Sequence, residues 1–349
     1  MERTDLKLLV EGGVLLISRA LEAGWPRASL FRRLRSEGWY RVQGGAWAEP
    51  GREVDLVVRL KAAQSVRPHL VVSHGSAARL WQIETLGEAP SHPSPPSHPS
   101  HPSQPSRPSH PSRPSHPSHH LEFTDPGLSA RQGFAGVRVH RIPLPELEVV
   151  ERSGLRVTEV PRTLADLLRA GPRDNALVAV ESALTYRRVG LARRPPLIAP
   201  ASLAVALETP LLGVARARGW LGLLDPRSGS PAETIARLRM HDAGLRPETQ
   251  VEVHPPDGRR RYLDFLFRAE GLAIEIEGYA YHGTRDAHRR DVARFNQLTQ
   301  CPQVRSVLRY TAEDVFHRPA TMIREVRAAL RAAAARSPHI DPPGTFTPP

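Results

Sequence analysis

The stretch RYLDFLFRAEGLAIEIEGYAYH, residues 261–282, predicts two antiparallel strands joined by a tight turn. Along both halves, apolar side chains alternate with other side chains, which is the period of a β-strand. The alternation puts Asp264, Glu275 and Glu277 on the face opposite the apolar side chains. The sequence therefore predicts a cluster of carboxylates on one face of a hairpin.

With the turn centred on Glu270 and Gly271, Asp264 is expected to lie directly opposite Glu277 and diagonal to Glu275. Cross-strand neighbours lie about 5 Å apart, so the three carboxylates would repel one another. A divalent cation, Mg²⁺ (or Mn²⁺), removes that repulsion because it binds carboxylate oxygens. The alternative is an amphipathic hairpin whose acidic face is simply hydrated.

The residues on either side of the hairpin bear on this choice. The segment YAYHGTRDAHRRD, residues 279–291, supplies His282 and several arginines, which suit a phosphate-containing substrate. His282 is a candidate to activate water or to protonate a leaving oxygen, and the alternative is a histidine that caps a turn. Upstream, Ser230 and Glu233 have the spacing of a helix-capping box. That box explains Glu233 by itself, and support of a metal site is the alternative.

The region around the hairpin predicts the element order α-β-β-β-α-β. A helix begins after Ser230 in SGSPAETIARLRMHDAG, and a second is expected in TRDAHRRDVARFNQLTQ. A last helix is expected over residues 318–334. The expected strands are TQVEVHP, RYLDFLFR, LAIEIEG and VRSVLRY.

These residues together resemble a known group of enzymes. Residues 229–330 resemble the PD-(D/E)xK nuclease superfamily, and within it the uncharacterised-domain family related to the very-short-patch-repair (Vsr) endonucleases. The motifs that carry the resemblance occur in order: Ser-Pro-Ala-Glu233, Leu-Asp264-Phe265, Glu275-Ile-Glu277-Gly278, His282, Asp291-Val-Ala-Arg294-Phe-Asn-Gln-Leu298 and Arg309-Tyr310-Thr311.

The resemblance implies a restriction-endonuclease-like core that cuts DNA with a bound metal ion. Asp264 and Glu275 would be the ligands of Mg²⁺ (or Mn²⁺). The implied catalytic set is Asp264, Glu275, Glu277, His282 and Glu233. Glu277 stands where the superfamily usually has lysine, and this domain contains no lysine, so an arginine or histidine would have to replace it. Whether Arg309 faces a phosphate or pairs with the acidic residues stays open.

The first 50 residues predict three short helices followed by a hairpin, which is the order of a winged helix-turn-helix. On the third helix, polar and basic side chains share one face at helical spacing, and Arg41 of the hairpin lies close to them. The alternative is a solvated face in an arginine-rich protein. This segment resembles the N-terminal winged helix of AbiEi-type antitoxins of type IV toxin–antitoxin systems. The residues expected to bind DNA are Ser29, Arg32, Arg33, Ser36 and Arg41.

The charge balance favours a polyanionic partner. The chain has 349 residues, with 48 Lys and Arg against 36 Asp and Glu. Such an excess indicates binding to nucleic acid or an anionic surface. One cysteine rules out a disulfide framework and a cysteine-based zinc site. No signal-peptide pattern and no long uncharged apolar run occurs, so a cytoplasmic protein without a membrane partner is expected.

The sequence as a whole predicts a multidomain α/β protein. The leading hypothesis for its function is a metal-dependent DNA endonuclease delivered by its winged helix. The alternative is a DNA-binding regulator or antitoxin whose nuclease-like domain does not cut, and whose partner would be a cognate toxin. The expected segments are a winged helix (1–50), a helical connector (51–88), a disordered Pro/Ser/His-rich linker (89–120), an α/β connecting module (121–225), the nuclease-like domain (226–335) and a disordered tail (336–349).

Overall fold

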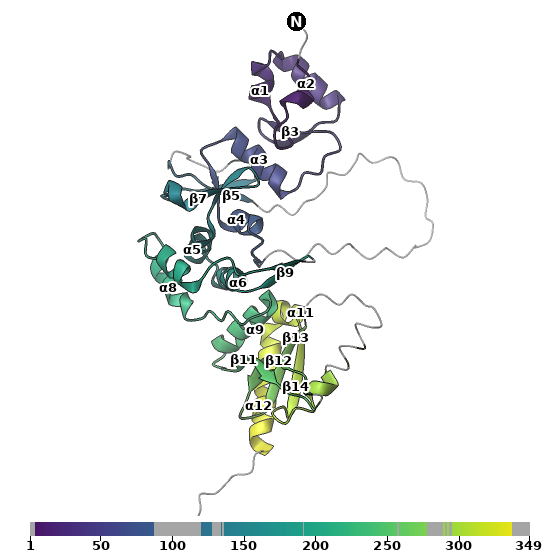
Figure 1. Cartoon of the computed structure of the whole chain (residues 1–349), viewed down its shortest axis with the longest axis vertical. Helices are drawn as coiled ribbons and strands as arrows, with labels where there is room; N and C mark the ends of the chain where they lie inside the picture. Colours follow the sequence, from purple (N-terminus) through teal and green to yellow (C-terminus); the bar gives the residue numbers. More distant parts are fainter. Residues whose placement is uncertain are drawn as a thin grey trace, which may run out of the picture. The chain divides into compact units, whose positions relative to one another are not determined.

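The chain is a multidomain α/β protein made of two compact units (Figure 1). The computed structural model describes residues 4–86, 120–127, 134, 136–190, 192–256, 258–277, 289, 292 and 295–336. Nearly all of the expected linker and tail, and also His282, lie outside these residues. No helix in the described ranges is long and apolar enough to cross a membrane. Unit 1 comprises Met1–Ala170 and Pro200–Val214, and unit 2 comprises Gly171–Ala199 and Ala215–Pro349.

Unit 1 begins with a small helical segment and a three-stranded sheet of order β1-β3-β2. The prediction of a first α-helix is wrong, because this segment forms a four-residue 3-10 turn, Leu6–Leu9. Gly12 and Gly13 have positive φ angles of 58° and 85° and form a separate tight turn between Glu11 and Val14, which leads the chain into a strand. The elements are η1 (Leu6–Leu9), β1 (Val14–Leu16), α1 (Ile17–Glu22), α2 (Arg27–Ser36), β2 (Tyr40–Gln43) and β3 (Ala46–Ala48).

Helix α2 is held in place by its apolar side. Leu30 and Leu34 are fully buried, four residues apart on one face, and they pack in a cluster with Trp25 and Trp39. Burial of each leucine side chain stabilises the segment by roughly 1.5–3 kcal/mol. The opposite face of α2, with its arginines, is therefore left to solvent.

A five-stranded sheet of order β6-β5-β4-β8-β7 forms the rest of unit 1. Residues 51–88 were expected to be a helical connector, but they also supply β4, the central strand, whose two residues are too few to show a period. The elements are α3 (Leu56–Val66), β4 (Val71–Val72), α4 (His74–Leu80), β5 (Leu121–Thr124), β6 (Val137–His140), η2 (Glu146–Glu148), β7 (Val149–Arg152), β8 (Leu155–Thr158), α5 (Val160–Ala170) and α7 (Pro200–Ala206).

A pair of stacked histidines lies beside this sheet. The rings of His74 and His140 are 3.5 Å apart at their centroids and nearly parallel. The carboxylate of Glu122 lies 3.2 Å from His140 Nε2 and accepts a hydrogen bond from the backbone amide of Gly75. His74 is 2 % exposed, and its φ is 49°. Burial, followed by the neighbouring His140, lowers the pKa of His74 from 6.5 to about 3.

Unit 1 is expected to lose stability in mild acid because of His74. The unfolded chain binds a proton below its ordinary pKa, whereas folded His74 stays neutral down to about pH 3. Stability is therefore lost as pH falls from about 6.5 towards 3, at about 1.4 kcal/mol per pH unit. At pH 5 the loss is about 2 kcal/mol. The loss of unfolding free energy is measured by urea unfolding at pH 7 and at pH 5. Unfolding is monitored by pulsed hydrogen exchange in β4 and β5.

His74→Asn is the matched variant for this measurement. Asparagine tolerates the left-handed backbone conformation of position 74 and does not titrate. The variant should lose most of the pH dependence between pH 7 and pH 5. An unchanged pH dependence in His74→Asn would assign the effect to other groups.

Unit 2 contains the region expected to be nuclease-like, and it also takes in residues 171–199, which the sequence assigns to the connecting module. The order α9-β11-β12-β13-β14 agrees with the expected order, and residues 295–298 before β14 are helical. The elements are α6 (Arg173–Leu184), β9 (Arg187–Val189), β10 (Ala192–Arg194), α8 (Val214–Leu221), α9 (Pro231–Asp242), β11 (Glu248–Val253), β12 (Arg261–Phe267), β13 (Leu272–Glu277), β14 (Ser306–Thr311), α11 (Ala312–His317) and α12 (Pro319–Arg336).

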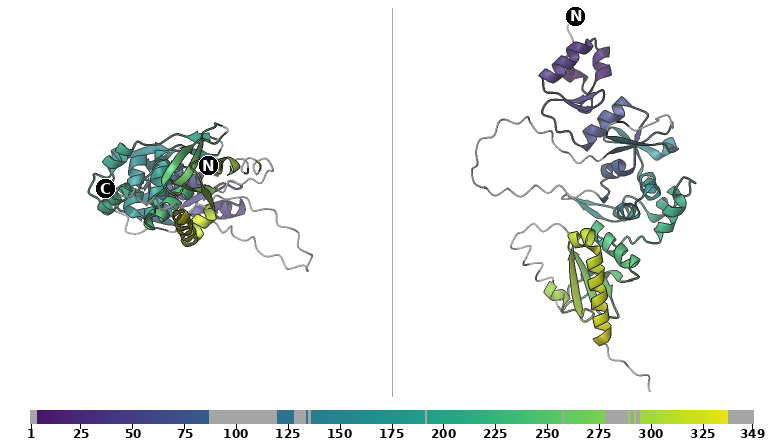
Figure 2. Two further views of the ribbon diagram at one scale, coloured as in Figure 1. Left: turned by 90° about the horizontal axis from the view of Figure 1, so that it is seen from below. Right: turned by 180° about the vertical axis from the view of Figure 1, so that it is seen from behind.

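The sheet of unit 2 has the order β11-β12-β13-β14, and its last pair is parallel. Helix α12 lies along one face of this sheet (Figure 2). Phe265 and Ile274, which pair across β12 and β13, are fully buried. The sheet therefore presents β12 and β13, its central strands, as a fixed frame for the acidic residues between them.

Candidate functional site

The pairing of β12 with β13 decides which carboxylates meet. Phe265 lies opposite Ile274, so the register brings Asp264 level with Glu275. The expectation that Asp264 lies opposite Glu277 is wrong by two residues. The turn is centred one residue earlier than expected, and each residue of displacement at a turn shifts the pairing by two.

The two strands part at this point, and carboxylate side chains bridge them. Regular pairing ends at Phe265, and the Oδ2 atom of Asp264 then accepts a hydrogen bond from the backbone amide of Ile276 at 2.7 Å. The Oε1 atom of Glu275, which is 7 % exposed, accepts from the backbone amide of Asp264 at 3.3 Å. Both side chains are thus fixed by backbone amides of the strands that they join.

Gln250 of β11 connects Asp264 to a third carboxylate. Its Nε2 atom donates to Asp264 Oδ1 at 3.0 Å and to Glu233 Oε2 at 2.9 Å. The φ of Gln250 is 51°, a left-handed conformation that costs an ordinary residue about 1–2 kcal/mol. Strain of this kind within a strand is common at functional sites. The sequence analysis did not find Gln250, because a lone glutamine in an alternating strand is not distinctive.

Glu233 has a different local role from the one expected. The Oγ atom of Ser230 accepts from the backbone amide of Glu233 at 3.2 Å, which is half of a capping box. The Glu233 carboxylate does not return to Ser230. It accepts from the backbone amide of Gly229 at 2.7 Å and from Gln250 instead. Helix capping alone therefore does not explain Glu233, which is 8 % exposed and joined to Asp264 through Gln250.

Glu277 pairs with Arg309 of β14. Arg309 Nε lies 2.7 Å from Glu277 Oε1, and each side chain is 28 % exposed. In the parallel register Arg309 lies beside Glu275, and its guanidinium lies 5.3 Å from the ring centre of Phe295. Of the two roles left open for Arg309, the structure places it with the acidic residues. It brings a positive charge to the edge of the carboxylate cluster.

The cluster can be compared with what a metal ion requires. Among the described residues, no group of three or more His, Cys, Asp or Glu side chains is arranged to hold a metal ion. Mg²⁺ is commonly held by one or two carboxylates and keeps several water molecules. The pair Asp264 and Glu275, with oxygen ligands only, fits Mg²⁺ or Mn²⁺ by this standard. His282 lies outside the described residues.

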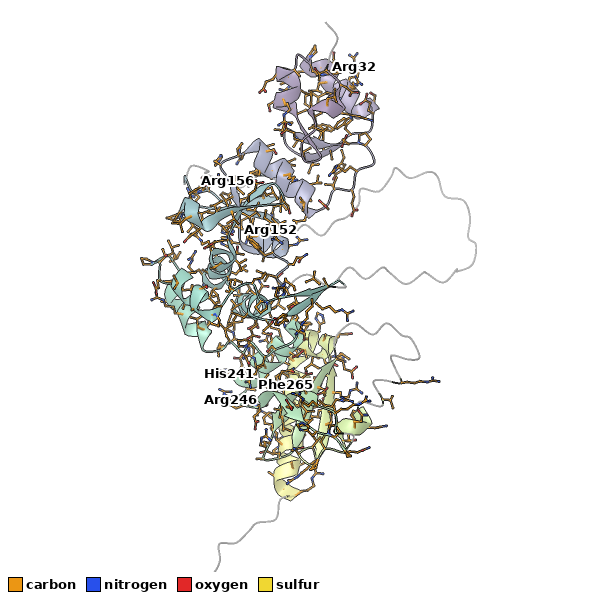
Figure 3. All side chains as sticks on the ribbon, viewed as in Figure 1. Arg32, Arg152, Arg156, His241, Arg246 and Phe265 are labelled. Carbon is orange, nitrogen blue, oxygen red and sulfur yellow. The ribbon has the colours of Figure 1, made fainter. Side chains whose placement is uncertain are left out.

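The exposed side of α2 forms a hollow of about 690 Å³ lined by Ala28, Phe31, Arg32, Arg35 and Ser36. These residues recur at helical spacing, so one face of α2 borders it. Arg32 is labelled in Figure 3. The hollow contains two of the five residues expected to bind DNA, and it adds Arg35, which the sequence analysis did not select.

The other residues expected to bind DNA do not border this hollow. Arg33 pairs with Glu37 at 2.5 Å and stacks over Trp25 at 5.1 Å, so its guanidinium is used within the segment. Ser29 is partly buried, and Arg41 is exposed on β2. The residues that line the hollow and the residues expected to bind DNA therefore overlap only in part.

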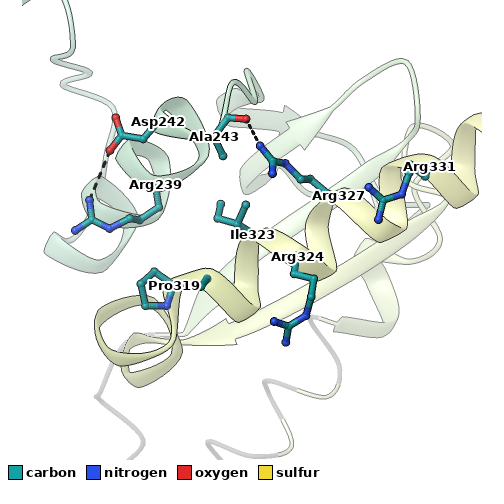
Figure 4. A pocket seen from close by; sticks show the side chains of 9 residues that line it. Arg239, Asp242, Ala243, Pro319, Ile323, Arg324, Arg327 and Arg331 are labelled. Atoms are coloured by element: carbon teal, nitrogen blue, oxygen red, sulfur yellow. Dashed lines mark hydrogen bonds and ion pairs between the residues drawn. The ribbon is translucent and has the colours of Figure 1, made fainter.

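A second hollow, of about 610 Å³, lies between α9 and α12 in unit 2 (Figure 4). Arg324 and Arg331 of α12 border it, and Ile323 lies at its floor. Arg327 is tied down, since it donates to the backbone carbonyl of Ala243 at 2.6 Å. This second basic surface lies on helices and has no hydrogen bond to the carboxylate cluster among the interactions of the described residues.

Comparison with known proteins reveals distant similarity but no assigned activity. The chain matches no family model. It is 26% identical over 306 residues to the uncharacterized protein MT2308 of Mycobacterium tuberculosis strain CDC 1551 / Oshkosh, and equally to the uncharacterized protein Rv2248 of strain H37Rv. The alignment covers 87% of this chain and 97% of each relative. The similarity therefore extends over both units rather than over one of them.

Proposed function

We propose that the protein is a metal-dependent DNA endonuclease. The observation that carries this proposal is the hydrogen-bonded series Glu233–Gln250–Asp264–Glu275, at the place where β12 and β13 part. Glu233 and Glu275 are buried and Asp264 is partly buried, and carboxylates removed from water are costly unless a cation or several donors offset their charge. The element order, the motifs and the paired acids support a nuclease core of the PD-(D/E)xK kind.

Asp264 and Glu275 are the residues that would hold Mg²⁺ or Mn²⁺. When bound, the ion supplies charge stabilisation to a phosphodiester and lowers the pKa of bound water. Gln250 holds Asp264 at a fixed angle through its amide group. Glu233 in turn holds Gln250. Arg309, beside Glu277, provides the positive charge that lysine usually provides in this superfamily.

The N-terminal 50 residues would deliver the enzyme to DNA as a winged helix. Helix α2 is the element proposed to enter the major groove, because its exposed face carries Arg32 and Arg35. Arginine binds guanine edges and phosphates through two parallel hydrogen bonds. The hairpin formed by β2 and β3 would act as the wing.

Incubation of the purified chain with supercoiled plasmid over a range of Mg²⁺ and Mn²⁺ concentrations tests the proposal. The expected result is conversion to open-circular DNA that requires the metal and stops in EDTA. Equal conversion in EDTA would refute metal dependence. Binding to DNA without conversion at any metal concentration would refute the enzyme and favour the second candidate.

The second candidate is a DNA-binding regulator or antitoxin with a nuclease-like domain that does not cut. It is favoured by one observation: Glu277 occupies the lysine position and is already neutralised by Arg309. On this hypothesis the acidic cluster is structural, and α2 alone carries the activity. A cognate toxin would then be the partner.

Both candidates predict that α2 binds DNA through Arg32 and Arg35. Arg32→Ala combined with Arg35→Ala should weaken binding to a short duplex by about tenfold or more, and should lower the salt dependence of binding by about two phosphate contacts. Arg33→Ala is the matched control, because Arg33 is engaged with Glu37 and Trp25. Equal losses in both proteins would contradict the assignment of this face. Fluorescence anisotropy at several salt concentrations measures the effect.

A further inference from the structure

A short hairpin in unit 2 carries an unusual arrangement of arginines. Strands β9 and β10 pair antiparallel, with Arg187 opposite Arg194 and Arg188 opposite Arg193. Figure 1 shows the hairpin projecting from the body of unit 2, with β9 labelled. Arg187 and Arg194 are 4 % and 8 % exposed, whereas Arg188 and Arg193 are exposed. The inner and outer pairs therefore have different roles.

The inner pair anchors the hairpin. Arg187 Nη1 donates to the backbone carbonyl of Ser228 at 2.9 Å. Arg194 donates to the backbone carbonyl of Pro195 at 3.0 Å and to the hydroxyl of Ser182. A two-stranded hairpin is at best marginally stable on its own in water. Two buried arginines bonded to carbonyls give it a fixed base.

Among the residues that the structure describes, the outer pair brings two like charges together without a local counter-charge. Cross-strand partners lie about 5 Å apart, and like charges directly opposite each other are destabilising. Among the described residues, neither Arg188 nor Arg193 has a carboxylate within ion-pair distance. Arg188 makes one long hydrogen bond, of 3.4 Å, to the carbonyl of Gly190. Arg193 stacks over the ring of Tyr186 at 4.2 Å, and that ring is 55 % exposed.

A polyanion lying along the hairpin would offset both charges, and a phosphodiester backbone fits this description. Arginine binds phosphate oxygens in a fork geometry, and an exposed tyrosine beside it suits a sugar or base. A two-stranded β-ribbon is narrow enough to enter the major groove of duplex DNA. Arg188 and Arg193 would thus lie against the DNA backbone while the hairpin follows the groove.

The base of the hairpin is also tied to the carboxylate cluster. Arg187 binds the carbonyl of Ser228, and the next residue, Gly229, donates its amide to Glu233. Glu233 is linked to Asp264 through Gln250. A continuous series of hydrogen bonds therefore joins the base of the hairpin to the residues proposed to hold the metal.

We infer that the β9–β10 hairpin is a DNA-binding arm of unit 2. Arg188 and Arg193 bind the phosphate backbone beside the carboxylate site. The inference rests on the proposed function for its choice of DNA. It is separate from the binding proposed for α2, because the two surfaces belong to different units.

The test uses the full-length chain carrying Arg32→Ala and Arg35→Ala, so that binding through α2 is already weakened. In this background, Arg188→Ala with Arg193→Ala should reduce affinity for a 20-base-pair duplex by about tenfold or more. The slope of log affinity against log salt should fall by about two. Arg188→Lys with Arg193→Lys, which keeps the charge, should recover most of the slope. Binding is measured without divalent metal, so that no cleavage interferes.

The matched control is Arg324→Ala with Arg331→Ala, which removes the same charge from the α9–α12 hollow. Its affinity should stay within about twofold of the background protein. Equal loss in both pairs would show a general charge effect and overturn the inference, and so would loss in the control pair alone. A preference for single-stranded RNA over the duplex, lost in the hairpin variant, would also overturn the choice of DNA.

The binding and nicking experiments distinguish a failure of this inference from a failure of the proposed function. If the chain binds DNA through the hairpin but never nicks plasmid, the nuclease hypothesis fails and the arm stands. If plasmid is nicked but the hairpin variant binds and cuts like the background protein, the arm fails and the nuclease stands. A wild-type chain that does not bind DNA at all refutes both.

Discussion

Asp264→Asn is expected to lower the rate of Mg²⁺-dependent plasmid nicking by at least about 100-fold while the chain stays folded. Asparagine keeps an oxygen that can accept the hydrogen bond from the amide of Ile276, so the link between β12 and β13 is retained. It removes the negative charge that a divalent cation requires of its ligand. Loss of several kcal/mol of charge stabilisation corresponds to a rate loss of this size.

Glu248→Gln is the matched control for Asp264→Asn. Glu248 lies on the same sheet, is exposed, and pairs with Arg268 at 2.6 Å. An exposed ion pair of this kind contributes about 0–1 kcal/mol, so the control should be as stable and as active as the wild type. Circular dichroism and thermal unfolding check that Asp264→Asn is folded. Nicking by a folded Asp264→Asn variant at the wild-type rate would remove Asp264 from the site.

Gln250→Ala is expected to reduce the nicking rate by about 10- to 100-fold, the usual effect of removing a residue that orients a metal ligand. Without the amide, Asp264 Oδ1 and Glu233 Oε2 each lose a donor, and the two carboxylates are no longer bridged. We also expect the Mg²⁺ concentration that gives the half-maximal nicking rate to differ from that of the wild-type protein. That concentration separates a positioning role from a purely structural one.

Gln250→Gly completes this experiment because the backbone at position 250 is strained. Glycine adopts a φ of 51° without cost, so Gln250→Gly should be more stable than Gln250→Ala by about 1 kcal/mol. Both variants should be equally poor in nicking, because both lack the amide. Equal stability of the two variants would show that the backbone at position 250 is not strained. Wild-type nicking and an unchanged Mg²⁺ requirement in Gln250→Ala would show that Gln250 only supports the sheet.

The strands of unit 2 could be predicted because their side chains alternate over six or seven residues. Leu263 and Phe265 are buried as this alternation predicts, although Leu266 on the opposite face is buried as well. The register could not be predicted, because it depends on where the turn is centred. An error of one residue there was enough to pair Asp264 with Glu277 instead of Glu275.

Other features of the two surfaces depend on contacts that form only when the chain folds. Gln250 is recognisable only when its strand lies beside Asp264 and its backbone is left-handed, and neither fact has a sequence pattern. Arg33 has the helical spacing of a DNA-binding residue, but Trp25 and Glu37 occupy its guanidinium. Helical periodicity gives the direction of a side chain, not the contacts that it makes after folding.

The parting of β12 and β13 has a consequence for how related sequences should be interpreted. Asp264 and Glu275 take over the hydrogen bonds that strand backbones would otherwise exchange. A relative without nuclease activity would still need a hydrogen-bond acceptor at both positions to close its sheet, so selection for folding alone would retain acids or their amides there. Their presence in a relative is therefore weak evidence of catalysis. Activity in such proteins is better judged from residues whose side chains do not bond to the backbone. The first of these to compare is Gln250, whose amide group bonds only to side chains.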